Sequence, residues 1–288
     1  MKLSVSSYSF QQYITSGKLT QFSAIAAAHD LGFDAIEFVT LNAPEGVTRR
    51  DFAKSLADEA ARLGMTINAY AVGANLFTPD EASKQAALAQ LFEEVDIAEI
   101  LGAKVMRHDV CWAYAPDKGG RSFDAMLPVI AENARAVTEY AAAKGIRTCS
   151  ENHGYIAQDS DRVERLVNAV GHPNYGVLID VGNFACADED SVTATSRLAP
   201  LAVHAHAKDF IKRSFLEGPA EGFFQTRGCN YLRGTAVGDG VIPVKQCIAV
   251  LKRAGYDGYL SLEYEGKEDC IEGIRRGREN LLSYLADL

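Results

Sequence analysis

The stretch "LGFDAIEF" at residues 31–38 recurs in altered form as "LGMTINAY" at 63–70, "LGAKVMRH" at 101–108 and "KGIRTCSE" at 144–151. Each copy ends a segment with helical periodicity, passes through a glycine and continues into a short strand-like run. Glycine readily adopts the left-handed conformation that commonly ends a helix. Each copy therefore predicts a helix that is followed directly by a strand.

The same alternation extends along the whole chain. It predicts strands at residues 3–8, 35–39, 66–71, 104–107, 146–150, 175–179, 202–206 and 259–262. It predicts helices at residues 19–31, 50–63, 80–101, 123–144, 161–170, 190–198, 243–254 and 269–286. Strands separated by helices indicate parallel βαβ units. Eight such units without an evident linker predict one domain, 1–288, folded as a (β/α)8 TIM barrel, with a doubly wound open sheet as the alternative.

The composition limits the class of protein. With 288 residues, 48% of them hydrophobic, the chain can bury a large core. A net charge of -9 argues against nucleic acid as the main partner, because phosphate binding requires a basic face. Six cysteines without a CxxC pair and no signal-peptide pattern lead us to expect reduced thiols and a cytoplasmic location. No apolar run approaches the roughly 20 residues that span a bilayer, so we expect no membrane association.

Ionisable residues lie at or next to the ends of most of the predicted strands. In a barrel of this kind the active site is built at the carboxyl ends of the strands, where these side chains would meet. Carboxylates that are buried together repel one another unless a positive group lies between them. A divalent cation is the simplest such group. The residues are Glu37, His108, Glu151, Asp180, His206 and Glu263.

Four of these residues form a candidate metal site. Glu151, Asp180 and Glu263 supply oxygen ligands and His206 supplies one imidazole, from the fifth to the eighth predicted strand. This set suits one Mn²⁺ or Mg²⁺ ion, with Co²⁺ or Zn²⁺ as alternatives, and it lacks the thiolates of a structural zinc site. We expect Mn²⁺.

The chain resembles the xylose isomerase-like barrels, a family that includes ketose 3-epimerases, hydroxypyruvate isomerases, inosose dehydratases and inosose isomerases. The resemblance covers the full length and rests on "GFDAIEF", "SENHG", "LIDVGN", "HAHAKDF", "VGDGVIPV" and "AGYDGYLSLEYEG", of which the last three are the most specific. It implies that Glu151, Asp180, His206 and Glu263 bind one divalent metal. It also implies that Glu151 and Glu263 act as acid and base on opposite faces of the substrate.

One position departs from the family pattern. Many members have a histidine three residues after the metal-binding aspartate, where it touches the substrate, and this chain has Asn183 in "DVGN". Asparagine donates and accepts hydrogen bonds but does not carry a proton near neutral pH. The metal site therefore carries over to this chain, whereas the epimerases' substrate contacts do not carry over directly.

The segment "LAVHAHAKDF" at 201–210 places His204, His206 and Lys208 on one face of a strand, because side chains alternate along it. Same-face neighbours lie about 6–7 Å apart, so only one histidine is expected to reach the metal. We expect His206 to be that ligand and His204 to lie in an interior layer below it. Lys208 is predicted at the rim, holding a substrate hydroxyl, carboxylate or phosphate or simply solvated, with Asp209 orienting it.

Other side chains near the strand ends are predicted to bind substrate. Glu37 would bond a substrate hydroxyl or pair with an arginine such as Arg107. Trp112, the only tryptophan, would stack on a sugar ring or else pack in the core. The predicted substrate contacts are Glu37, His108, Trp112, His153, Asn183, Lys208, Arg227 and Arg233.

Arg227 and Arg233 fall in residues 217–240, the longest segment without clear periodicity. Long loops in compact domains often carry function. We expect this segment to close over a substrate and to place an arginine on a carbonyl or an anion, and a structured surface loop is the alternative. The glycines of "VGDGV" have no P-loop lysine after them, so no nucleotide cofactor is expected.

These features predict a metal-dependent sugar isomerase or epimerase that acts on a ketose or keto-polyol through an enediolate, with proton transfer between two glutamates. A lyase that uses the same enediolate to expel a neighbouring group, as in inosose dehydratases or enzymes that cleave 3-keto-glycosides, is the alternative. DNA repair by a relative of the three-zinc endonuclease is less favoured, given Asn183 and the net charge of -9. A non-catalytic sugar-binding barrel also stays open. The resemblance makes a homo-oligomer a further expectation.

Overall fold

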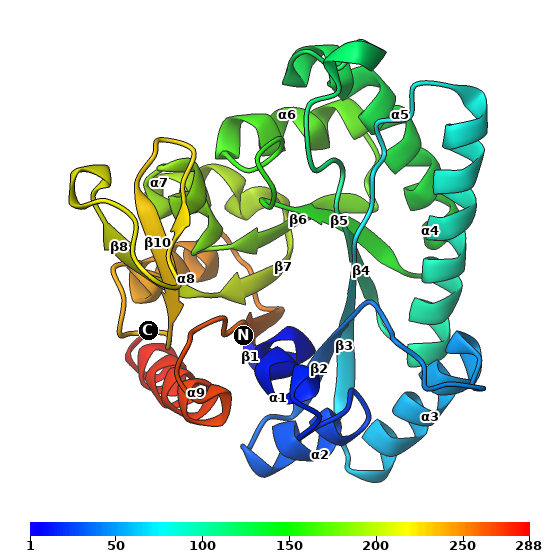
Figure 1. Ribbon diagram of the computed structural model, residues 1–288. Helices are drawn as coiled ribbons and strands as arrows, with labels where there is room; N and C mark the ends of the chain where they lie inside the picture. Colours follow the sequence, from blue (N-terminus) through cyan, green and yellow to red (C-terminus); the bar gives the residue numbers. More distant parts are fainter.

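The computed structural model describes residues 1–288 and shows a closed barrel of eight parallel strands surrounded by helices (Figure 1). Around the barrel the strand order is β1, β11, β7, β6, β5, β4, β3 and β2. This closure excludes the open doubly wound sheet. The barrel strands are β1 (Lys2–Ser6), β2 (Ala35–Val39), β3 (Thr66–Val72), β4 (Val105–His108), β5 (Arg147–Glu151), β6 (Tyr175–Asp180), β7 (Ala202–Ala207) and β11 (Tyr259–Leu262).

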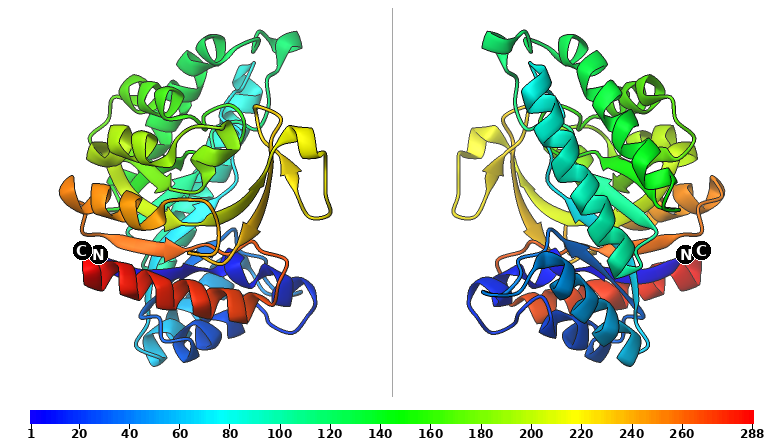
Figure 2. Two further views of the ribbon diagram at one scale, coloured as in Figure 1. Left: turned by 90° about the vertical axis from the view of Figure 1, so that its left-hand side faces the viewer. Right: turned by 90° about the vertical axis from the view of Figure 1, so that its right-hand side faces the viewer.

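Helices surround the barrel, and most are packed against their sequence neighbours (Figures 1 and 2). None combines the length and apolar character that crossing a bilayer requires. The helices are α1 (Gln11–Thr15), α2 (Ser23–Asp30), α3 (Arg49–Arg62), α4 (Glu81–Leu101), α5 (Phe123–Ala142), α6 (Ser160–Val170), α7 (Ser191–Leu198), α8 (Val244–Arg253) and α9 (Cys270–Asp287).

The four helix-to-strand junctions of the recurring motif have the predicted conformation. Gly32, Gly64, Gly102 and Gly145 all have positive φ, between 69° and 84°. At each junction the chain leaves a helix through the left-handed glycine and enters a barrel strand within a few residues. The motif therefore sets where β2, β3, β4 and β5 begin.

Two predicted boundaries are wrong near the N-terminus. The strand predicted at 3–8 ends at Ser6, because Ser7–Phe10 form a 3₁₀ turn capped by the Ser6 hydroxyl, which accepts a hydrogen bond from the Tyr8 amide. The helix predicted from residue 19 starts at Ser23, because Thr20 and Ser23 exchange side-chain to backbone hydrogen bonds in a turn. In both places serine or threonine side chains compete with regular backbone pairing.

A small antiparallel sheet interrupts the barrel pattern after β7. Its strands are β8 (Asp209–Arg213), β9 (Phe224–Gln225) and β10 (Tyr231–Thr235), in the order β8, β10, β9. Figure 2 shows this arm (residues 209–235), in yellow, projecting beyond the barrel. Much of the arm falls in residues 217–240, which were predicted to lack regular structure. The strands were missed because β9 has two residues and because a single residue, Lys208, separates β8 from β7.

Asp209 anchors the base of the arm. Its carboxylate accepts hydrogen bonds from the backbone N–H groups of Phe210 (2.8 Å), Gly238 (2.9 Å), Gly240 (3.0 Å) and Ile242 (3.0 Å). It therefore organises the loop that leads from β10 to α8. The expectation that Asp209 orients Lys208 is wrong, because its oxygens are used by this backbone.

We expect Asp209→Ala to lower the free energy of unfolding by roughly 2–4 kcal/mol, because it leaves four N–H groups without their acceptor, including those of the buried residues Phe210 and Ile242. Urea denaturation followed by circular dichroism measures this change. Asp239→Ala in the same loop is the control, because that carboxylate pairs only with the exposed Arg276. Equal, small effects of the two substitutions would contradict the anchoring role of Asp209.

Candidate active site and metal centre

The carboxyl ends of the barrel strands open into a cavity of about 500 Å³. Two of its glutamates close strands: Glu151 is the last residue of β5, and Glu263 directly follows β11. Most of the residues that line the cavity are polar or charged, which suits a hydroxylated substrate better than an apolar one. The charged or titratable wall residues are Glu37, Arg107, Asp109, Glu151, His153, His206, Lys208, Glu263 and Glu265.

The four predicted metal ligands lie together at this end of the barrel. Glu151, Asp180, His206 and Glu263 each offer one ligand atom, and these atoms lie within 4.8 Å of one another. The Nδ1 atom of His206 is 3.3 Å from a Glu263 oxygen and 3.9 Å from oxygens of Glu151 and Asp180. Three carboxylates and one imidazole are a donor set for a hard divalent cation.

Two atoms of this cluster have no hydrogen-bond partner although they are buried. They are Nδ1 of His206 and Oδ2 of Asp180. Nζ of Lys208 lies 3.3 Å from that oxygen but outside hydrogen-bond geometry. Burial raises the pKa of Asp180 to about 6, in spite of Lys208. Unpartnered buried polar atoms are rare in proteins, so the residues present fit a divalent cation held between them.

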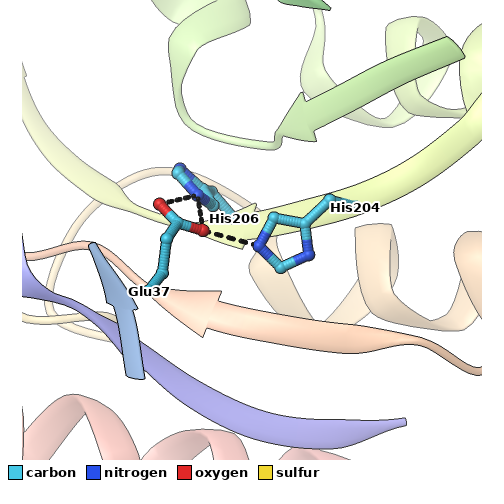
Figure 3. Close-up of side chains that lie close together, drawn as sticks. All are labelled: Glu37, His204 and His206. Atoms are coloured by element: carbon cyan, nitrogen blue, oxygen red, sulfur yellow. Dashed lines mark hydrogen bonds and ion pairs between the residues drawn. The ribbon is translucent and has the colours of Figure 1, made fainter. Parts of the chain in front are cut away.

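Glu37 lies beneath the cluster, between the two histidines of β7 (Figure 3). Its carboxylate accepts hydrogen bonds from Nε2 of His204 at 2.6 Å and from Nε2 of His206 at 3.0 Å. Glu37 therefore pairs with these imidazoles and not with Arg107. Because the Nε2 atom of His206 is bound in this way, its Nδ1 atom faces the three carboxylates.

The charges of Glu37 and His206 favour an ionised carboxylate beside a protonated imidazole. Burial alone would raise the pKa of Glu37, but His206 and His204 hold it well below its usual value. Burial would lower the pKa of His206, but Glu37 and Glu263 raise it well above its usual value. A cation bound at Nδ1 would replace the proton that this imidazole otherwise carries.

Lys208 is a buried member of the cluster, not a solvated residue at the rim. It is 5% exposed, and its Nζ lies 2.8 Å from Glu263, 3.3 Å from Asp180 and 3.4 Å from Glu265. Burial would lower the pKa of Lys208, but these carboxylates raise it well above its usual value. The ammonium group is therefore a fixed positive charge beside the candidate metal position.

We expect Lys208→Met to tighten Mn²⁺ binding at least about tenfold, equivalent to about 1.4 kcal/mol. The ammonium competes with a cation for the oxygens of Glu263 and Asp180, and its removal also leaves repelling carboxylates in the metal-free protein. Isothermal titration with Mn²⁺ measures the affinity. The matched control is Lys212→Met, whose ammonium is 3.6 Å from Asp188 and half exposed. Weaker Mn²⁺ binding in Lys208→Met would mean that the lysine chiefly holds Glu263 in place.

Asn183 bridges two charged residues of the site. Its Nδ2 donates to Glu151 at 2.8 Å, and its Oδ1 accepts from Lys208 at 3.3 Å. The amide thus orients a candidate metal ligand through a direct contact. Where the resemblance leads us to expect a histidine, this chain has a neutral side chain whose donor and acceptor already bind Glu151 and Lys208.

A second group of charged residues was missed at the end of β4. Arg107 contacts Glu151 at 2.6 Å and Asp109 at 2.7 Å, and Asp109 in turn lies 2.9 Å from Nδ1 of His153. The predicted residue, His108, is fully buried outside the cavity wall, and its Nδ1 contacts the carbonyl of Asp109. Side chains alternate along a strand, so Arg107 and Asp109 share the inward face that His108 lacks. Counting residues by twos from the strand end could have found them.

The remaining predicted contacts divide between the cavity wall and the arm. Trp112 lies in the wall with its ring edge-on to His153, at a centroid distance of 5.2 Å. Arg227 pairs with Asp159 at 2.6 Å and Arg233 pairs with Glu268 at 3.2 Å, both outside the cavity wall. The two arginines therefore do not lie where they were expected to hold a substrate. Wall residues that sequence reasoning did not single out include Tyr8, Gln11, Asn42 and Glu265.

Fold and site together define a parallel (β/α)8 barrel with an acidic cluster able to hold a metal at the carboxyl end of its strands. The chain belongs to the xylose isomerase-like TIM barrel family, whose model matches residues 25–284. The predicted fold and family are confirmed.

The chain is similar to proteins with different named activities. An inosose dehydratase from Yersinia enterocolitica is 27% identical over 150 residues, which are 47% of this chain and 47% of that protein, so the chain matches about half the length of this curated relative. A solved L-ribulose 3-epimerase superposes with a TM-score of 0.72 at 17% identity, covering 99% of this chain and 95% of the other. The zinc-bound IOLI protein superposes with a TM-score of 0.75 at 14% identity, covering 100% and 99%. These two structural likenesses show the shared fold.

Proposed function

We propose that this protein is a divalent-metal-dependent isomerase or epimerase that acts on a ketose or keto-polyol. The observation that carries the proposal is the set of Glu151, Asp180, His206 and Glu263, with two buried ligand atoms that lack a hydrogen-bond partner. Mn²⁺ is the cation we favour, because oxygen donors dominate the set. The inosose dehydratase and epimerase relatives support a carbonyl-bearing polyol as substrate.

Glu151 and Glu263 are the proposed proton carriers. When bound, the cation supplies positive charge that favours loss of a proton next to a carbonyl group. The two glutamates come from β5 and from the end of β11, with β6 and β7 between these strands, so they flank the site from two sides. One takes the proton and the other returns a proton to the opposite face or to the neighbouring carbon.

The surroundings of the two glutamates differ. Burial would raise the pKa of Glu263, but Lys208 and His206 hold it well below its usual value, so it is ionised. Both groups contact the same oxygen of Glu263, which leaves its other oxygen free to take a proton. Glu151 is held at both oxygens, by Arg107 on one and Asn183 on the other. Glu263 is therefore the proposed base for the first step, and Glu151 is the proposed partner that completes it.

Deuterium uptake tests this proposal. Metal-loaded protein in D₂O is expected to introduce deuterium next to the carbonyl of at least one member of a ketose and keto-polyol panel, detected by NMR. Metal-free protein is the control. No uptake across the panel contradicts the proposal, and tight metal binding without uptake would indicate a sugar-binding barrel.

A lyase is the second candidate, favoured by the match to inosose dehydratase and by Asn183 in place of the family histidine. In that reaction loss of the same proton is followed by departure of a group from the adjoining carbon, which leaves an enone. Ultraviolet absorbance of the enone that rises as the substrate is consumed would assign the lyase. A deuterated isomer that forms without such absorbance would assign the isomerase.

A further inference from the structure

We propose that the substrate has two parts and that a second cavity, beneath the arm, binds an aryl ring attached to the sugar unit. This inference rests on the proposed function for the sugar half. The second cavity has a volume of about 510 Å³ and adjoins the first, because the two share wall residues. The shared residues are Tyr8, Trp112, His153, Lys208 and Glu265. Cavities that enclose drug-sized ligands have volumes of about 300–1,000 Å³, so the two together have room for a ligand with two parts.

Exposed aromatic rings line the second cavity. Trp112, Tyr155 and Phe224 are 51%, 53% and 40% exposed and come from three separate segments of the chain. Apolar rings left open to solvent and gathered around one hollow commonly mark a binding surface. Aromatic side chains present large faces for stacking at little entropic cost, because they have two rotatable side-chain bonds.

These rings are held in place by the protein. Trp112 packs edge-on against His153, and Phe224 packs edge-on against Phe210 at a centroid distance of 5.7 Å. The Tyr155 hydroxyl donates to the carbonyl of Gln225, which ties this ring to the arm. The wall is therefore formed before a ligand binds.

The arm is also fixed against the barrel at this cavity. Gly234 of β10 pairs with Gly266, and a Cβ atom at Gly234 would lie 2.6 Å from the carbonyl oxygen of Glu265. Only a residue without a side chain allows this close approach. Glu265 lines both cavities, so this contact joins the arm to the wall that the two cavities share.

A buried polar atom in the second cavity selects among ring types. Gln158 lines this cavity, is 5% exposed, and has an Oε1 atom without a hydrogen-bond partner. If the amide turned toward the cavity, this atom would accept one hydrogen bond, for instance from a phenolic hydroxyl. Asn183, the other neutral amide of this wall, is already used by Glu151 and Lys208. The charged groups of this wall, Lys208 and Glu265, lie on the side shared with the first cavity, whereas the exposed aromatic faces of Tyr155 and Phe224 suit a flat ring with a single donor.

Binding of glycosides that lack a carbonyl group tests the inference without any turnover. Calorimetry on the Mn²⁺-loaded protein compares 4-hydroxyphenyl β-D-glucoside, methyl β-D-glucoside and cellobiose. We expect the aryl glucoside to bind at least tenfold more tightly than the other two and to quench fluorescence of Trp112, the only tryptophan. Equal affinities, absence of binding by all three, or tighter binding of cellobiose would overturn the inference.

Substitutions in the arm provide the matched comparison. Phe224→Ala is expected to weaken binding of the aryl glucoside about tenfold and to leave binding of the methyl glucoside unchanged. Phe215→Ala is the control, because Phe215 is exposed on the same arm and lines neither cavity. An unchanged aryl affinity in Phe224→Ala contradicts the inference. Failure of deuterium uptake with an intact aryl preference would instead contradict the proposed function alone.

Discussion

Replacing His206 with alanine is expected to abolish retention of the divalent cation, whereas replacing His204 leaves retention nearly unchanged. The Nδ1 atom of His206 lies among the three carboxylates without a hydrogen-bond partner, while the Nε2 atom of His204 contacts Glu37 and Ser261 below them. Loss of a residue that only orients a ligand weakens metal binding by about 10–100-fold, so loss of the ligand itself should exceed this range. Equilibrium dialysis followed by metal analysis measures retention.

His204→Ala provides the control within the same strand. It removes a buried hydrogen-bond partner of Glu37 and should lower the free energy of unfolding by roughly 1–3 kcal/mol. Thermal denaturation of the metal-free variants separates this effect from metal loss. Equal metal loss in a folded His204→Ala protein would show that the two histidines act as one unit.

The sequence allowed the barrel to be predicted because its local signals agree with its long-range pattern. Strands β2 and β11 begin and end at the predicted residues, 35–39 and 259–262. Each recurring junction carries its own glycine, so no tertiary contact is needed to place it. The arm lacks such signals, since its short strands are stabilised by contacts such as Phe210 against Phe224, which are 14 residues apart.

The candidate ligands could also be predicted, because parallel barrel strands bring their carboxyl ends together whatever the details of packing. The partners of those ligands could not. Glu37 reaches His204 and His206 across 167 and 169 residues, and no pattern in the sequence joins them. Lys208 likewise is buried by Asp180, Glu263 and Glu265 from other strands or loops, so its exposure depends on the closed barrel.

The structure also changes the electrostatic argument for a metal. Clustered carboxylates alone would require a positive group, but Arg107 and Lys208 already lie among them. Repulsion between carboxylates is therefore partly relieved by the protein itself. The stronger argument is the geometry of the two unpartnered atoms on His206 and Asp180. Neither Arg107 nor Lys208 forms a hydrogen bond with them.

Glu37→Gln is expected to weaken Mn²⁺ binding by about 10–100-fold, although Glu37 is not among the proposed ligands. A carboxylate accepts from the Nε2–H groups of both His204 and His206, whereas an amide offers one acceptor and turns its NH₂ toward the other donor. The Nε2–H group of His206 is then held less firmly, so its Nδ1 atom is less well directed at the candidate ligands. The affinity falls because the imidazole must be oriented when the metal binds.

The same change should destabilise the metal-free protein by about 3–5 kcal/mol, because it breaks a buried charge pair. The pKa of Glu37 lies well below its ordinary value of 4.5, so the pair stabilises the fold above pH 4.5, and this stabilisation is lost as the pH falls toward the lowered pKa. The variant should lack that part of the acid dependence. Urea denaturation of metal-free protein across this acid range measures both effects.

Glu94→Gln separates the two effects of Glu37→Gln. Glu94 is also a buried glutamate, paired with Arg49 and Tyr70 away from the cavity. Its replacement should destabilise the fold while the Mn²⁺ affinity of the folded protein stays unchanged. If both variants lose affinity in proportion to stability, metal binding depends on general rigidity of the barrel. If only Glu37→Gln loses affinity, Glu37 controls metal binding through the orientation of His206.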